Sequence, residues 1–126
     1  MRDQDSGNCL AIKNILADKV TESKKQDNTI IRIACHELES FYLGDLFAVE
    51  QGLCIHGIYK KQNKKKYRLP DNLSNASDEL RKLSKNKYQK IAGSRSIAPY
   101  LKIDGSNKSH SFNMLIEGIK KIMYSV

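Results

Sequence analysis

The segment that most constrains the fold is one short apolar run at residues 29–35 (Thr-Ile-Ile-Arg-Ile-Ala-Cys). It is rich in β-branched residues and bounded by polar ones, which is the pattern of a buried β-strand. A lone strand would leave unpaired backbone groups along both of its edges. We therefore expect a chain that is either N-terminally truncated or completed by strands of a partner, and we favour truncation.

The other apolar residues recur at the spacing of helices. Asn8 is placed to cap the first helix, and Asp45 to cap a later one that ends at Gly52. Gly93 is expected to break another helix, and residues 60–70 are expected to form a polar loop. The expected helices cover residues 9–23, 36–43, 46–51, 74–83, 87–92 and a final segment from Ser109 onward. The fold class is therefore α/β, helix-rich, with few strands in this chain.

Length and composition narrow the class of protein. The 126 residues suit one domain, residues 1–126, rather than two. The N-terminus has no apolar signal-peptide core, and no apolar run approaches the length of a membrane span. Three cysteines without a CxxC pair argue against a disulfide scaffold. These features predict a cytoplasmic protein that does not contact membranes.

The charge is unevenly distributed along the chain. The net charge is +8, but residues 1–59 hold 6 basic and 9 acidic residues, whereas residues 60–102 hold 13 basic and 3 acidic ones. An acidic half followed by a basic segment suits a metal site next to a bound polyanion, and it also suits an ordinary solvated surface.

The sharpest acidic motif is Asp3-Gln4-Asp5-Ser6-Gly7. In an extended segment the carboxylates of Asp3 and Asp5 project to the same side, where both can bind a hard cation such as Mg²⁺. The alternative is structural, because Asp, Ser and Gly are also the usual residues of turns and helix caps.

A second acidic group follows the expected strand. Glu37, with His36 and Glu39 beside it, begins a stretch that is otherwise rather apolar, so its carboxylate must be solvated, paired or bound to metal. Its alternative role is to stabilise the first turn of a helix. A zinc site built from cysteine and histidine fits poorly, because the ligand spacing around Cys35 and Cys54 is wrong.

Two basic segments are candidate nucleic-acid contacts. The first is flanked by Tyr59 and Tyr67, whose rings can stack on bases, while its lysines neutralise phosphates. The second combines a helix end, hydroxyls and a guanidinium around Gly93. The candidate residues are Lys60, Lys61, Lys64, Lys65, Lys66 and Arg68 in the first segment, and Lys90 and Arg95 in the second. Solvated loops and ordinary helix caps remain the alternatives.

Four ordered blocks of this sequence resemble the bacterial domain-of-unknown-function family 4276. They are Arg-Asp-Gln-Asp-Ser-Gly-Asn-Cys at 2–9, Ile-Arg-Ile-Ala-Cys-His-Glu-Leu-Glu-Ser-Phe-Tyr-Leu-Gly-Asp at 31–45, Tyr-Gln-Lys-Ile-Ala-Gly-Ser-Arg-Ser-Ile-Ala-Pro at 88–99 and Ser-His-Ser-Phe-Asn at 109–113. The resemblance implies a Toprim-like domain, an open α/β sheet of the three-layer type, of which this chain would be the helix-rich portion.

The resemblance also implies an activity. In Toprim-like proteins an Asp-x-Asp after a strand, matched here by Asp3 and Asp5, holds Mg²⁺ for phosphodiester chemistry, and Glu37 would assist. The glutamate-containing motif that family members carry upstream has no counterpart in this chain, in keeping with truncation. The resemblance thus implies a Mg²⁺-dependent nuclease or phosphotransfer domain, acting with a partner ATPase in phage defence. The alternatives are a non-catalytic module that binds nucleic acid or docks a partner, and an inactive remnant.

Overall fold

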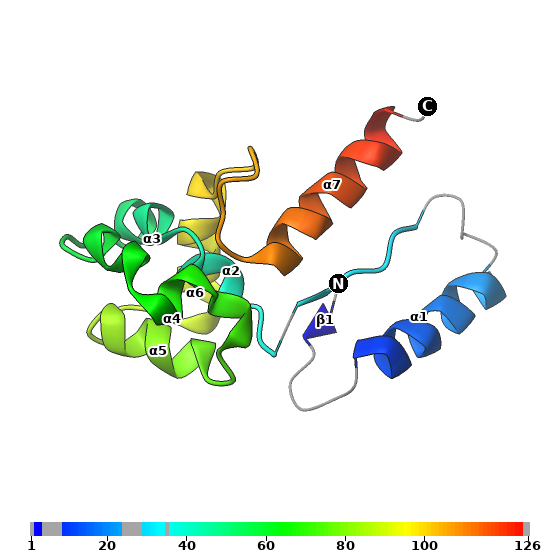
Figure 1. The fold of residues 1–126 in the computed structure, drawn as a ribbon, viewed down its shortest axis with the longest axis horizontal. Coiled ribbons are helices and arrows are strands. Elements are labelled where there is room, and N and C mark those ends of the chain that lie inside the picture. Colours follow the sequence, from blue (N-terminus) through cyan, green and yellow to red (C-terminus); the bar gives the residue numbers. More distant parts are fainter. Residues whose placement is uncertain (1, 4–8, 24–28, 35, 125–126) are drawn as a thin grey trace.

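The computed structural model describes residues 2–3, 9–23, 29–34 and 36–124. These residues are mainly helical, and most helices gather in one cluster while α1 and α7 extend away from it (Figure 1). The elements are β1 (Arg2–Asp3), α1 (Cys9–Ser23), β2 (Ile33–Ala34), α2 (Ser40–Leu43), α3 (Leu46–Leu53), the 3₁₀ turn η2 (Tyr59–Asn63), α4 (Lys65–Arg68), the 3₁₀ turn η3 (Pro70–Asn72), α5 (Ala76–Leu83), α6 (Lys90–Ile97), the 3₁₀ turn η4 (Ala98–Tyr100) and α7 (His110–Tyr124).

The expected strand forms only in part, but it has a partner. β2 covers two residues of the predicted seven, and it pairs in parallel with β1, whose residues the sequence assigned to the Asp-rich loop. The expectation of a lone strand was therefore wrong. Parallel strands need a long connection between them, and α1 lies in that connection. The described residues show this pair and no wider sheet.

The hydrophobic core lies among α2, α3, α5 and α6, with the first turn of α7 packed against it. Leu43, Leu46, Leu80 and Ile97 have no exposed surface. The Phe41 and Phe112 rings meet edge to face, with centroids 5.2 Å apart. The core therefore joins segments that are more than 70 residues apart in the sequence.

Two glycines that were expected to end helices lie inside them. Gly52 is in the last turn of α3, which ends instead at Cys54 with a left-handed φ of 54°. A Cβ at Gly52 would lie 2.6 Å from the Ser96 carbonyl oxygen of α6, so glycine permits the close approach of the two helices. Gly93 lies within α6 against the Tyr88 ring, where a Cβ would be 2.6 Å from Cδ1. Packing explains both glycines, and the predicted helix breaks were wrong.

Other predicted boundaries shift for local reasons. The helix expected from residue 36 begins at Ser40, because His36 has a φ of 58°, outside the helical range. The segment 60–70 contains η2 and α4 instead of a loop, and Tyr67 and Pro70 within it are buried. The helices at 9–23, 46–53, 76–83 and 110–124 agree with the predicted ones to within a few residues.

The cap predicted at Asp45 is confirmed, since its Oδ1 accepts from the Ala48 N–H of α3. The cap predicted at Asn8 lies outside the described residues. None of the helices in the described ranges has the length and apolar character needed to cross a membrane.

Candidate nucleic-acid interface

The register of the two strands places Asp3 at a defined edge. Arg2 pairs with Ile33 and Asp3 with Ala34. Because the strands are parallel, their last residues, Asp3 and Ala34, lie beside each other at the same edge of the pair. Asp5 lies outside the described residues.

Glu37 contributes to the fold as well as standing near this edge. Its Oε2 accepts from the Ser77 N–H, at 3.3 Å, in the first turn of α5. The Glu37 carboxylate therefore helps to anchor the first turn of α5, which is about 40 residues downstream. Within the described ranges no three His, Cys, Asp or Glu side chains are grouped as metal ligands.

Glu39, beside it, belongs to the core. It is 1 % exposed, and its Oε1 accepts from the Tyr88 hydroxyl at 3.0 Å. Burial, followed by the nearby Glu39 carboxyl, raises the pKa of Tyr88 above its usual range. These two residues tie α2 to the segment before α6.

A pocket of about 430 Å³ gathers three lysines from distant parts of the chain. Lys60 comes from η2, and Lys102 and Lys108 come from the segment between η4 and α7. We call this site the basic pocket. It is lined by Gly44, Asp45, Tyr59, Lys60, Gln62, Asn63, Lys102, Ser106 and Lys108.

Gln62 fixes the η2 wall of the basic pocket. Its amide nitrogen donates to the carbonyl oxygens of Leu43, at 2.9 Å, and Tyr67, at 2.8 Å. Its amide oxygen accepts from the Leu46 N–H at 2.8 Å. One side chain thus satisfies three backbone groups and holds η2 against the junction of α2 and α3.

Asp45 and Asn107 fix the opposite wall. Asp45 Oδ2 accepts from the Lys102 N–H at 3.0 Å, while Oδ1 caps α3. The Asn107 amide donates to the Phe41 carbonyl oxygen at 3.0 Å, and the Lys108 N–H donates to the Gly44 carbonyl oxygen at 2.9 Å. The backbone that carries Lys102 and Lys108 is therefore positioned by hydrogen bonds to the end of α2.

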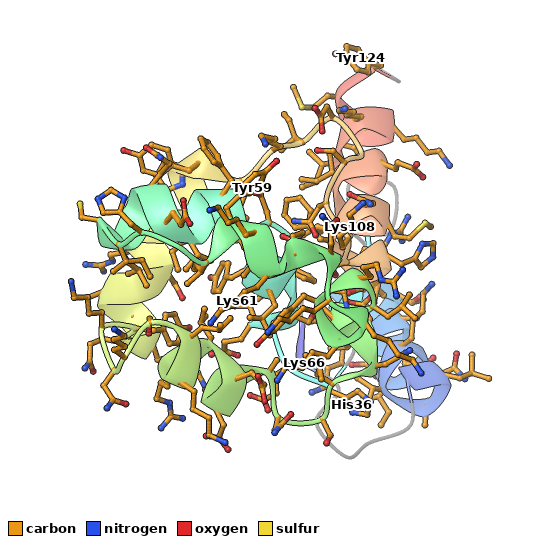
Figure 2. All side chains as sticks on the ribbon, turned by 60° about the vertical axis from the view of Figure 1, so that its left-hand side comes forward. His36, Tyr59, Lys61, Lys66, Lys108 and Tyr124 are labelled. Carbon is orange, nitrogen blue, oxygen red and sulfur yellow. The ribbon has the colours of Figure 1, made fainter. Side chains whose placement is uncertain are left out.

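An aromatic pair, Phe47 and Tyr59, lies at the rim of the basic pocket. The two rings are nearly perpendicular, with centroids 5.8 Å apart, and the Lys102 ammonium lies 4.9 Å from the centre of Phe47. Tyr59 is 56 % exposed and Phe47 is 39 % exposed. Figure 2 shows Tyr59 and Lys108 on the face that also carries Lys61. This face combines cations with accessible aromatic rings.

The other predicted basic residues are distributed differently. Lys66 is paired with Glu79 at 3.1 Å, and this hydrogen bond raises the pKa of its ammonium group. Tyr67 is 3 % exposed and donates to the same Glu79, so its ring is not available for stacking. Lys64 and Lys65 line a separate pocket of about 460 Å³ together with Lys66, and neither Lys61 nor Arg68 lines the basic pocket.

The second predicted anion site takes another form. Lys90 and Arg95 lie on the continuous helix α6, so the expected helix end and new start do not exist there. Lys90 instead lines a separate pocket of about 390 Å³ together with Arg81.

Sequence reasoning identified Lys60 but missed Lys102 and Lys108. Neither has a basic neighbour in sequence, and only the tertiary fold brings them within one pocket with Lys60. The one signal pointing toward them was indirect, since Gly44 and Asp45 end one of the blocks that carry the family resemblance. The serines of the 109–113 block are structural: Ser109 Oγ donates to Asp71 Oδ1 at 2.6 Å, and the Ser111 N–H donates to Asp71 Oδ2 at 2.8 Å.

Comparison with known families gives one match. Residues 3–120 match the family described as a domain of unknown function, DUF4276. No curated protein and no solved structure matches the chain.

Proposed function

The chain belongs to the DUF4276 family, and from this premise we propose that it binds nucleic acid through the basic pocket. The observation that carries the proposal is the convergence of Lys60, Lys102 and Lys108 on one pocket beside exposed aromatic rings. Lysines neutralise phosphates by releasing counterions, and rings supply contact to bases.

The chemistry of the basic pocket supports this proposal over a generic charged surface. Its hydrogen-bonded walls hold the lysine backbones in place before any ligand binds. The one acidic residue in its lining, Asp45, already accepts two backbone N–H groups, which offset part of its charge. A polyanion therefore meets three cations against one partly compensated carboxylate.

The test is salt-dependent binding of a labelled oligonucleotide. Changing Lys60, Lys102 and Lys108 together to Gln should weaken binding and make the slope of log K against log salt less steep by about 2. The matched control changes three exposed lysines outside the basic pocket, Lys19, Lys87 and Lys121, to Gln. Equal losses in both triple variants would show that only net charge matters and would refute the site.

A second candidate is Mg²⁺-dependent phosphodiester chemistry in a Toprim-like domain that works with a partner ATPase in phage defence. The observation that favours it is the parallel register, in which Asp3 pairs with Ala34, three residues before Glu37 in the sequence. Carboxylates are the donors that Mg²⁺ prefers, so Asp3 and Asp5 suit the ion, and Glu37 would assist them. When bound, the ion would neutralise the phosphate under attack.

In this candidate function, the chain's own basic residues hold the substrate. In the view of Figure 2, Lys61 and Lys66 lie between Tyr59 at the basic pocket and His36 just after β2. A phosphate backbone bound at the basic pocket thus has a further cation, Lys61, along that direction, whereas Lys66 is already paired with Glu79.

Cleavage assays test the second candidate separately from binding. Changing Asp3 and Asp5 together to Asn should abolish Mg²⁺-dependent cleavage while leaving oligonucleotide binding in EDTA unchanged. Asp18→Asn, on the exposed face of α1, is the control. Cleavage that persists in the double variant would exclude these carboxylates as the metal site. Affinity purification of the chain from its native cells tests the ATPase partner: a nucleotide-hydrolysing protein that co-purifies would support it, and the absence of any would contradict it.

A further inference from the structure

We infer that the basic pocket recognises single-stranded nucleic acid, with one base stacked on the aromatic pair and the adjoining phosphates among the three lysines. This inference rests on the proposed function and specifies its substrate class. It is carried by the combination of Phe47, Tyr59 and Lys102 at one rim.

The aromatic pair is presented outward by the fold. Glu50 Oε1 accepts from the backbone N–H groups of Ile58 and Tyr59, each at 2.7 Å. These two hydrogen bonds fix the start of η2 relative to α3, the helix that carries Phe47. The backbone of Tyr59 is thus held in place, yet its side chain exposes more than half of its surface. The exposed area is therefore available to a ligand.

A stacked base requires a nucleotide that is not paired within a duplex. In a double helix both faces of each base are covered by its neighbours, so an exposed ring on a protein can stack only on an unpaired or extruded base. The phosphates of a duplex would contact the lysines, but no base of the duplex could stack on the aromatic pair.

The closeness of the Lys102 ammonium to the Phe47 ring also favours a single-stranded ligand over a duplex. Lys102 contributes to both features, because its side chain lies over Phe47 and lines the basic pocket. A base on the aromatic pair would therefore place its own phosphate beside Lys102, and the next phosphates beside Lys60 and Lys108. The pocket volume of about 430 Å³ is in the range of sites that hold small polar groups such as phosphates.

Fluorescence anisotropy with the full chain tests this inference. The probes are fluorescein-labelled oligothymidylate and oligouridylate of about 15 nucleotides, and a duplex of matched length. We expect at least one single strand to bind about tenfold more tightly than the duplex. Tyr59→Leu should weaken single-strand binding by about fivefold or more and change duplex binding less.

Tyr124→Leu is the matched control, because Tyr124 is 82 % exposed and lies at the far end of α7 from the basic pocket (Figure 2). It should leave all three affinities unchanged. A second readout reports stacking directly. The chain has no tryptophan, so its intrinsic emission is that of tyrosine, and unlabelled single strands should quench it less in Tyr59→Leu.

The outcomes separate the inference from the proposed function. Duplex binding as tight as single-strand binding, or single-strand binding that is unchanged in Tyr59→Leu, would overturn the inference while the lysine variants still support the proposed function. No effect of the pocket lysines on any probe would overturn both.

Discussion

At the scale of single residues, Gly44 determines how closely the segment that carries Lys108 approaches the end of α2. Its φ of −77° is one that any residue adopts, so glycine is not needed there for backbone conformation. A Cβ at this position would collide with the Asn107 side-chain oxygen and lie 2.7 Å from the Ser109 backbone nitrogen. Glycine is needed because two backbones pass close together.

We therefore expect Gly44→Ala to destabilise the protein by about 1–3 kcal/mol, because the segment that carries Lys108 must move away. Chemical denaturation measures the change. Gly57→Ala is the comparison, since its φ of 88° disfavours Ala but nothing lies near its Cβ. A free energy of unfolding that is unchanged in Gly44→Ala would contradict the close contact.

The Glu79 carboxyl is expected to make the free energy of unfolding depend on pH in the acidic range. Burial raises the pKa of its carboxyl, but hydrogen bonds from Lys66 and Tyr67 outweigh burial and leave the pKa below its ordinary value. A depressed pKa contributes stability above the unfolded-state pKa, and this contribution is lost as the pH falls through the folded-state pKa. The free energy of unfolding should therefore fall less between about pH 6 and pH 3 in Glu79→Gln than in the unmodified protein. Glu117→Gln, exposed on α7, should retain the full dependence, and identical pH profiles for both variants would contradict the role of Glu79.

At the scale of elements, side chains from other segments anchor the helix ends. The N-terminus of α7 is held by Asp71 of η3, whose carboxylate accepts from Ser109 Oγ, the Ser111 N–H and Ser111 Oγ. α5 is held in the same way by Glu37. A helix anchored from a distant segment takes its position, and not only its length, from that contact.

We expect Asp71→Ala to cost about 1–3 kcal/mol, because the first turn of α7 and the two buried serines, Ser109 and Ser111, lose their charged acceptor. Asp78→Ala should change stability by less than about 0.5 kcal/mol, since Asp78 is exposed and its pair with Arg81 is a surface ion pair. Thermal or urea unfolding of the two variants gives the comparison. Equal effects would show that Asp71 is not an anchor.

At the scale of the whole molecule, the packing is uneven. α3 lies in the core with Leu46, Ala48 and Val49 fully buried, whereas α1 buries only Ile12 among its described side chains. Leu10 and Ile15 of α1 are more than half exposed, and Figure 1 shows α1 apart from the helical cluster. Helices with few buried side chains open at a lower free-energy cost.

Hydrogen exchange should therefore distinguish the two helices. We expect the backbone amides of α1 to exchange at least about tenfold faster than those of α3, measured by mass spectrometry under conditions in which the protein stays folded. Protection of α1 equal to that of α3 would contradict this difference in packing.

The helices were more predictable than the site. The apolar spacing at 9–23 and in the last segment, and the cap at Asp45, depend on residues within one or two helical turns of each other, so local sequence contains the information. Gly52 and Gly93 were misassigned as helix ends because their role depends on α6 and on the Tyr88 ring, which pack against them. Tyr67 was expected at a nucleic-acid surface, but its burial against the core is a tertiary property.

The sequence by itself indicated a helix-rich chain, its family, and the basic segment that contains Lys60. Only the tertiary structure decided which cations share a pocket, because hydrogen bonds of Asp45, Gln62 and Asn107 hold the segments of Lys60, Lys102 and Lys108 against the end of α2. It also gave the expected lone strand its partner at Arg2–Asp3. The physical reason is the range of the interactions: helix formation is decided by neighbours a few residues apart, whereas a pocket or a strand pair is decided by hydrogen bonds between segments that are tens of residues apart.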